Sequence, residues 1–215
     1  MGLIARRESA MQDNVFTMLE MQDAMNTRVH PEWRKQGFAW YRAIWTECAE
    51  LLDHHGWKWW KKQESDIDQV KLELVDIWHF ALSELIRSDQ LNASLGEELA
   101  KVEPIDSNPE TFRKAIEALA ASSLQSRSFR MSDFTNAMRT LPMDLKELFA
   151  LYVGKNVLNR FRQDHGYKEG SYRKLWAGRE DNEHLIEILG SVSVEPEQMF
   201  DMLYQQLELR YSQET

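Results

Sequence analysis

The chain has 215 residues, of which 43% are apolar, and a formal net charge of −9. We expect one domain over residues 1–215, because this length and composition suffice for a sizeable core. The negative charge argues against a nucleic-acid binder, the apolar runs fall short of the about 18 residues of a membrane span, and the lone Cys48 excludes an internal disulfide. Without a signal-peptide pattern, the expected location is cytoplasmic.

Helical periodicity dominates the sequence, and the alternating pattern of strands is scarce. The expected fold class is therefore all-α. Residues 1–7 are expected to be frayed, and residues 27–37, 57–62, 122–130 and 163–181 are expected to form loops. The predicted helices, in chain order, are residues 11–26, 38–54, 66–88, 110–124, 131–139, 142–161, 182–189 and 196–211.

Local signals place several helix ends. Gly56 is suited to the C-terminal stop of the helix 38–54, Ser65 or Asp66 to the N-cap of the next helix, and Pro109 to the first position of a third. The helical patterns are weaker over residues 88–141, the middle region of the chain. We expect this middle region to be a helical and more mobile subdomain.

Two acidic pairs lie in the predicted helices 38–54 and 66–88. Glu47 and Glu50 form one pair and Glu73 and Asp76 the other, each with the three-residue spacing that places both carboxylates on one helix face. Apolar residues flank both pairs, and carboxylates beside a core need a compensating positive charge. A hard divalent cation, most plausibly Mg²⁺, is the simplest compensation. The alternative is two ordinary solvated helix faces.

A second constellation is basic and lies near the C-terminus. Lys155, Asn159 and Arg162 share one helix face, and a glycine-punctuated segment with several basic residues follows. Such a segment could clamp a polyphosphate and close over it, although no P-loop motif is present. The alternative is a solvated basic loop. The basic residues of this segment are Lys168, Arg173, Lys174 and Arg179.

Two further pairs allow a different class of protein. Asp76 and His79, and Asp181 and His184, have the spacing of the carboxylate–histidine pairs of di-iron helical bundles. His79 is also well explained as a core histidine, and Trp78 as a core aromatic residue.

Two runs of the sequence resemble the all-α dimeric dUTPases, which belong to the all-α NTP pyrophosphatase superfamily. The first run is ECAEL…WKWWK…ELVDIWHF and carries the E-x-x-E and E-x-x-D motifs of the superfamily. The second is YVGKNVLNRFRQDHGYKEGSYRKLWAGREDNE, which is longer and more specific. The likeness covers residues 22–86 and 151–183, and none of it falls in the middle region. It implies a helical bundle of the all-α NTP pyrophosphatase type.

The resemblance implies a homodimer that hydrolyses dUTP and dUDP to the monophosphate by Mg²⁺-dependent attack of water. In that family the residues matching Glu47, Glu50, Glu73 and Asp76 bind magnesium ions, and the one matching Glu47 also orients or deprotonates the water. A related pyrophosphatase with another base preference, and an inactive interaction protein, stay open as alternatives. Implied contacts to the deoxyuridine nucleotide are Gln22, Asn26, Asn182, Lys58, Lys61, Lys155, Asn159, Arg162, Lys168 and Lys174.

Overall fold

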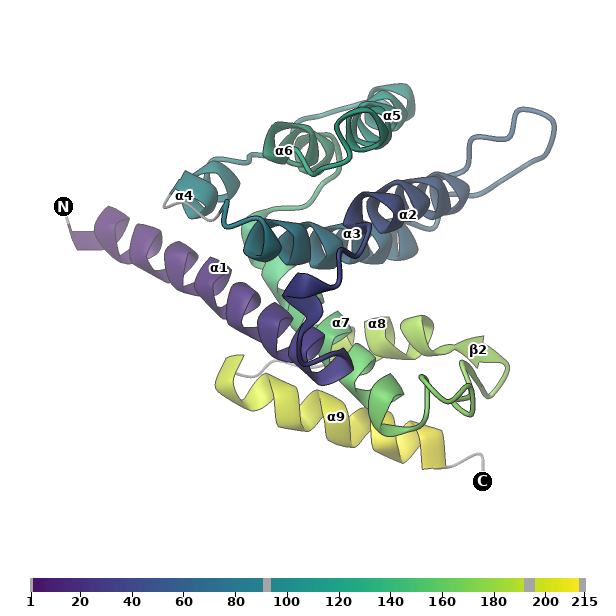
Figure 1. The fold of residues 1–215 in the computed structure, drawn as a ribbon. Helices are drawn as coiled ribbons and strands as arrows, with labels where there is room; N and C mark the ends of the chain where they lie inside the picture. The colour runs from purple at the N-terminus through teal and green to yellow at the C-terminus, as the bar shows by residue number, and fades with distance from the viewer. Residues whose placement is uncertain (1, 91–93, 192–195, 213–215) are drawn as a thin grey trace. The chain divides into compact units, whose positions relative to one another are not determined.

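The computed structural model describes residues 2–90, 94–191 and 196–212 (Figure 1). Over these residues the fold is all-α, as the sequence predicts, with one short hairpin. None of the helices described combines the length and the hydropathy needed to cross a bilayer. The elements are α1 (Gly2–Val29), the 3-10 helix η1 (Trp33–Lys35), α2 (Trp40–His55), α3 (Ile67–Arg87), α4 (Ser94–Ala100), α5 (Pro109–Ser126), α6 (Met131–Thr140), α7 (Leu145–Asp164), β1 (Leu175–Trp176), β2 (Arg179–Glu180), α8 (Asp181–Ser191) and α9 (Pro196–Ser212).

The helix ends predicted from local signals are confirmed. Gly56 ends α2 with a φ of 80°, a left-handed conformation that favours glycine. Asp66 caps α3, because its side chain accepts a hydrogen bond from the backbone N–H of Gln69 at 3.2 Å. Pro109 is the first residue of α5.

Three predictions about irregular segments are wrong. The helix α1 begins at Gly2, so residues 2–7 are helical rather than frayed, and α5 continues to Ser126, well into the predicted loop 122–130. The loop 163–181 contains the antiparallel pair β1 and β2. These strands have two residues each, too few to show an alternating pattern, and the turn between them relies on positive φ at Ala177 and Gly178.

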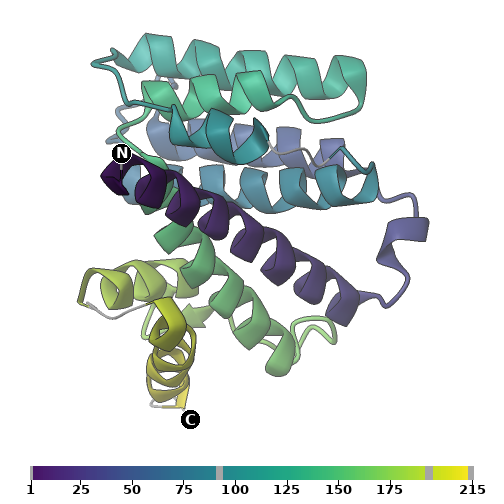
Figure 2. The same ribbon diagram turned by 90° about the vertical axis from the view of Figure 1, so that its left-hand side faces the viewer.

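The chain divides into two compact units, residues 1–149 and 150–215. In the first unit α2 and α3 lie side by side in opposite directions, and α5 and α6 form a layer against them (Figure 2). The helix α1 packs on α3 from the other side. Whether residues 88–141 are more mobile than the rest stays a prediction.

The helix α3 is the centre of the first unit and is buried around most of its circumference. Trp78, predicted to be a core residue, is fully buried and stacks on Phe134 of α6 with ring centroids 4.9 Å apart. On the neighbouring helix α2, Cys48 is buried as a small packed residue, as expected. Because α3 is surrounded, the acids that it carries toward α2 are partly or fully removed from bulk water.

In the second unit, α7 packs closely on α8. A Cβ atom added at Gly154 would lie only 2.8 Å from Leu189 Cδ1, so a larger residue there would displace the Leu189 side chain. Toward the end of α7, Phe161 is buried in an aromatic cluster with Trp176, Tyr204 and Tyr211. This packing fixes the helix on which the predicted basic residues stand.

Candidate functional site

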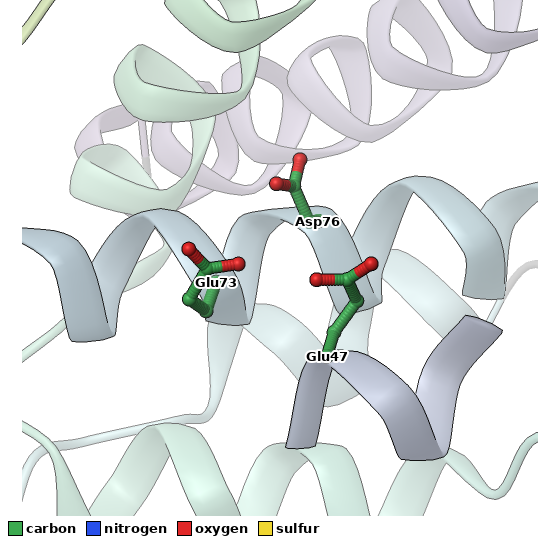
Figure 3. Close-up of side chains that lie close together, drawn as sticks. All are labelled: Glu47, Glu73 and Asp76. Carbon is green, nitrogen blue, oxygen red and sulfur yellow. The ribbon is translucent and has the colours of Figure 1, made fainter. Parts of the chain in front are cut away.

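Three carboxylates from α2 and α3 converge in the first unit (Figure 3). Glu47 extends from α2, and Glu73 and Asp76 extend from successive turns of α3. One oxygen from each lies within 4.8 Å of the others. Glu73 is buried and the other two are half-buried. The predicted convergence of acids from neighbouring helices is therefore confirmed for these three side chains.

Glu50, the fourth acid of the predicted metal site, lies on the exposed face of α2, one turn after Glu47. It contributes no oxygen to the group of three that the described residues form. Its charge nevertheless acts on that group, because it is one of the neighbours that raise the pKa of Glu47. Its role as a metal ligand stays a prediction.

The electrostatics of the cluster favour binding of a cation. Burial, followed by the charges of Asp76, Glu73 and Glu50, raises the pKa of Glu47 to about 9. The imidazole of His54 lies at the edge of the cluster, with Nε2 3.7 Å from Glu73 Oε1. Carboxylate oxygens are the ligands that Mg²⁺ and Ca²⁺ prefer, so the residues present fit a hard divalent ion.

We expect the cluster to make thermal stability depend on pH and on divalent metal. The pKa of Glu47 is about 9 in the folded protein against an ordinary 4.5, so the folded state binds the proton more tightly. In EDTA, stability should therefore fall as pH rises from about 5 to about 9, and added Mg²⁺ should restore it, most strongly at the alkaline end. Differential scanning fluorimetry across this range measures both trends. In the control Glu47→Gln the slope in EDTA should be shallower, and a magnesium effect that shrinks with rising pH would contradict the idea.

A buried polar network lies one turn further along α3. Gln22 Nε2 donates to Asn26 Oδ1 at 3.0 Å and to Ser83 Oγ at 3.1 Å, and Asn26 Nδ2 donates to the same hydroxyl at 2.8 Å. The ring of His79 is bonded through Nδ1 to Gln22 Oε1 at 2.7 Å. Gln22 and Asn26 are therefore oriented side chains between α1 and α3 rather than solvated ones. His79 is buried, as the sequence indicates, and follows Asp76 by one helical turn.

The second unit holds its own buried cluster, around Asp181. Arg162 binds this carboxylate through two bonds, Nε to Oδ2 at 2.8 Å and Nη2 to Oδ1 at 2.7 Å. Burial alone would raise the pKa of Asp181, but the hydrogen bonds and charge of Arg162 outweigh it and hold that pKa below its ordinary value. Tyr172 also donates to Asp181 Oδ2 at 2.8 Å. Asp181 is the central residue that sequence reasoning missed, noted there only as a possible partner of His184.

The predicted basic face of α7 is part of this cluster. Lys155 is 2% exposed and donates to Asn182 Oδ1 at 2.8 Å, and Arg162 Nη1 donates to Asn159 Oδ1 at 3.2 Å. Arg162 also reaches Asn182 Oδ1 at 3.3 Å. Because Arg162 uses several donors on protein partners, it is well placed to orient the two asparagines.

The remaining predicted lysines lie at the surface of their units. Lys58 forms an ion pair with Asp53 at 2.5 Å, and Lys174 pairs with Glu180 across the hairpin at 3.2 Å. Lys61 and Lys168 are exposed. Their contacts to a substrate stay predictions.

The described contacts of the carboxylate–histidine pairs are mostly with other groups of the protein. His79 bonds to Gln22 rather than joining Asp76 in the acidic cluster. In the second pair, Asp181 is bound by Arg162, whereas His184 Nε2 bonds to the carbonyl of Trp176 at 2.9 Å. In the second pair, both side chains are therefore engaged by groups other than each other.

Comparison with known families gives a match over residues 14–167 to the family described as dUTPase. This range includes the three carboxylates, the Gln22 and Asn26 network, and the face of α7 from Lys155 to Arg162. It ends before Asp181 and Asn182. A comparison with curated proteins finds no match.

Proposed function

Because this chain belongs to the all-α dimeric dUTPase family and is therefore a dUTP diphosphatase, we propose that it cleaves dUTP and dUDP to dUMP at the carboxylate cluster of α2 and α3. The observation that carries the proposal is the convergence of Glu47, Glu73 and Asp76 within 4.8 Å. We further propose that the cluster, joined by Glu50, holds Mg²⁺. Bound there, Mg²⁺ would neutralise phosphate charge and make a coordinated water more acidic.

Glu47 is proposed as the residue that prepares the attacking water. It is the one member of the group of three that α2 supplies, so it approaches the shared region from the opposite side to Glu73 and Asp76 (Figure 3). A carboxylate within reach of the water can accept its proton as the oxygen attacks phosphorus.

The buried amides of α1 are proposed to recognise the uracil ring. A base edge presents donors and acceptors that a buried Gln and Asn can match, and a site built on such bonds rejects bases that leave them unpaired. His79 and Ser83 hold the two amides in place, which lowers the cost of ordering them for binding. Lys155 and Arg162 carry the charged donors that bind phosphate oxygens, which supports a role in holding the phosphates or nucleotide, together with Asn159, Asn182 and the predicted surface lysines.

A substrate panel tests this function. With Mg²⁺ we expect dUTP to give dUMP and pyrophosphate, and dUDP to give dUMP and phosphate. The value of kcat/KM for dCTP, dTTP and UTP should be lower than that for dUTP by a factor of about 100 or more. Each of these nucleotides changes a group that the site must match. EDTA should stop all turnover. Equal rates on the four triphosphates would favour a related pyrophosphatase, and the absence of turnover on any nucleotide would favour an interaction protein.

We also propose that the active protein is a homodimer, like other members of the all-α dimeric dUTPase family. Size-exclusion chromatography with light scattering gives the mass in solution. A monomer that is fully active would contradict this part of the proposal.

A further inference from the structure

The connector between α2 and α3, residues 56–66, is fixed at its base and exposed at its tip. The backbone N–H of Asp66 donates to the carbonyl of His54 at 3.0 Å, and Ser65 Oγ donates to the carbonyl of His55 at 2.6 Å. At the tip, the side chain of Trp59 is 89% exposed. The two ends of the connector are therefore tied together beside the helices that carry the acidic cluster.

One peptide group of the connector, between Gly56 and Trp57, is held from both sides. Gln63 Oε1 accepts the N–H of Trp57 at 3.0 Å and the next N–H, that of Lys58, at 2.8 Å. On the other side of the peptide, Arg113 Nη2 of α5 donates to the carbonyl of Gly56 at 2.7 Å. A Cβ atom added at Gly56 would lie 3.1 Å from Gln63 Cβ, so the chain is closely packed at this point.

Arg113 reaches this peptide from the middle region, where the sequence carries no recognisable motif. The helix α5 packs against α2 (Figure 1), and next to Arg113 the ring of Phe112 lies over His55 with centroids 4.9 Å apart. A guanidinium at the C-terminal end of a helix satisfies a carbonyl that lacks a helical partner and complements the negative end of the helix dipole. A bond of this charged kind is stronger than an ordinary one.

The residue that follows the held peptide is Lys58. Its ammonium group pairs with Asp53 of α2 at 2.5 Å and lies 6.0 Å from the centre of the Trp57 ring, so the side chain is ordered along the helix end. A shift of the Gly56–Trp57 peptide moves Lys58 directly. Lys58 and Lys61 are the connector residues proposed to contact the nucleotide.

We propose that Arg113 is a positioning residue for the reaction: by holding the carbonyl of Gly56 it sets where Lys58 stands for the substrate phosphates. The inference rests on the proposed function, since it takes Lys58 as a phosphate contact. It gives α5, and with it the middle region, a part in substrate binding without any contact to the nucleotide.

The variant Arg113→Met keeps the aliphatic stem and removes the donor. We expect KM for dUTP to rise about tenfold, the factor that corresponds to the loss of one hydrogen bond from a charged group. The value of kcat should change less than about twofold. Arg113→Lys should recover part of the loss. The control is Lys114→Met on the next residue, an exposed side chain that pairs with Glu110 at 3.6 Å and should leave both constants unchanged.

Hydrogen exchange supplies a readout independent of turnover. In Arg113→Met the amides of Trp57 and Lys58 should exchange about tenfold faster, whereas those around Glu73 should not change. Gln63→Ala loosens the same peptide from its other side and should give the same KM shift, so it serves as the second variant if Arg113→Met does not fold. Because both residues act on one peptide, the double variant should lose less than the product of the two effects.

Two results would overturn the positioning role of Arg113. One is a folded Arg113→Met enzyme with wild-type KM, and the other is an unchanged exchange rate at Trp57 and Lys58. A wild-type protein that turns over no deoxyuridine nucleotide would instead overturn the proposed function and, with it, this inference. The two failures are therefore distinguishable in one set of measurements.

Discussion

Replacing Glu47 by Gln should lower kcat for dUTP by about 10³-fold at saturating Mg²⁺, while binding of the nucleotide with metal survives. The amide has nearly the same shape and keeps an oxygen toward the cluster, but it can no longer accept a proton from water. The substitution also removes the repulsion between the charge of Glu47 and the charges of Glu73 and Asp76. Steady-state kinetics and isothermal titration with dUTP and Mg²⁺ separate turnover from binding.

Two further variants make this test specific. Glu50→Gln, one turn away on the exposed face of α2, should raise the Mg²⁺ concentration that gives half the maximal rate and cost less kcat than Glu47→Gln. Glu117→Gln removes an exposed charge from α5 and should change neither quantity. A Glu47→Gln enzyme with full activity would refute the catalytic role of Glu47.

Replacing Arg162 by Met should destabilise the second unit by about 3–5 kcal/mol and abolish activity. The reason is that Asp181 is 0% exposed and would keep its negative charge without the guanidinium that binds it at 2.7 and 2.8 Å. Unfolding in urea, followed by hydrogen exchange of the α7 and α8 amides, measures the loss. The control Arg160→Met lies on the same helix, and its half-exposed 3.8 Å pair with Asp164 should be worth less than about 1 kcal/mol.

A double variant separates stability from function. Adding Asp181→Asn to Arg162→Met removes the stranded charge and keeps an oxygen for the hydroxyl of Tyr172, so most of the lost stability should return. Activity should stay low, because Asn159 and Asn182 lose the side chain that orients them. If activity recovers along with stability, Arg162 serves only as the counter-ion of Asp181.

The features that could be predicted from the sequence are those fixed within one or two helical turns. Gly56 and Asp66 end one helix and begin the next through contacts with their immediate neighbours, and the spacing of Glu73 and Asp76 places both on one face wherever the helix lies. The family resemblance, which rests on runs of adjacent residues, is confirmed over residues 14–167 for the same reason.

Other features depend on partners that are distant in the chain. Gln22 and Asn26 have the spacing of an ordinary solvated face, and they are buried because Ser83 of another helix meets them. The pairing of Asp181 with Arg162 was not recognised, because it joins residues 19 apart that meet only where α7 packs against α8. No pattern links Arg113 to the carbonyl of Gly56, 57 residues away.

By itself, then, the sequence determined the helices of this protein, the faces of its acids and its family, because hydrogen bonds and side-chain contacts within a helix span three or four residues. Tertiary structure alone decided which carboxylates share a point, which amides join a buried hydrogen-bond network and which cation compensates a buried acid. Those outcomes depend on how helices pack against one another, and packing joins residues whose separation along the chain carries no regular signal.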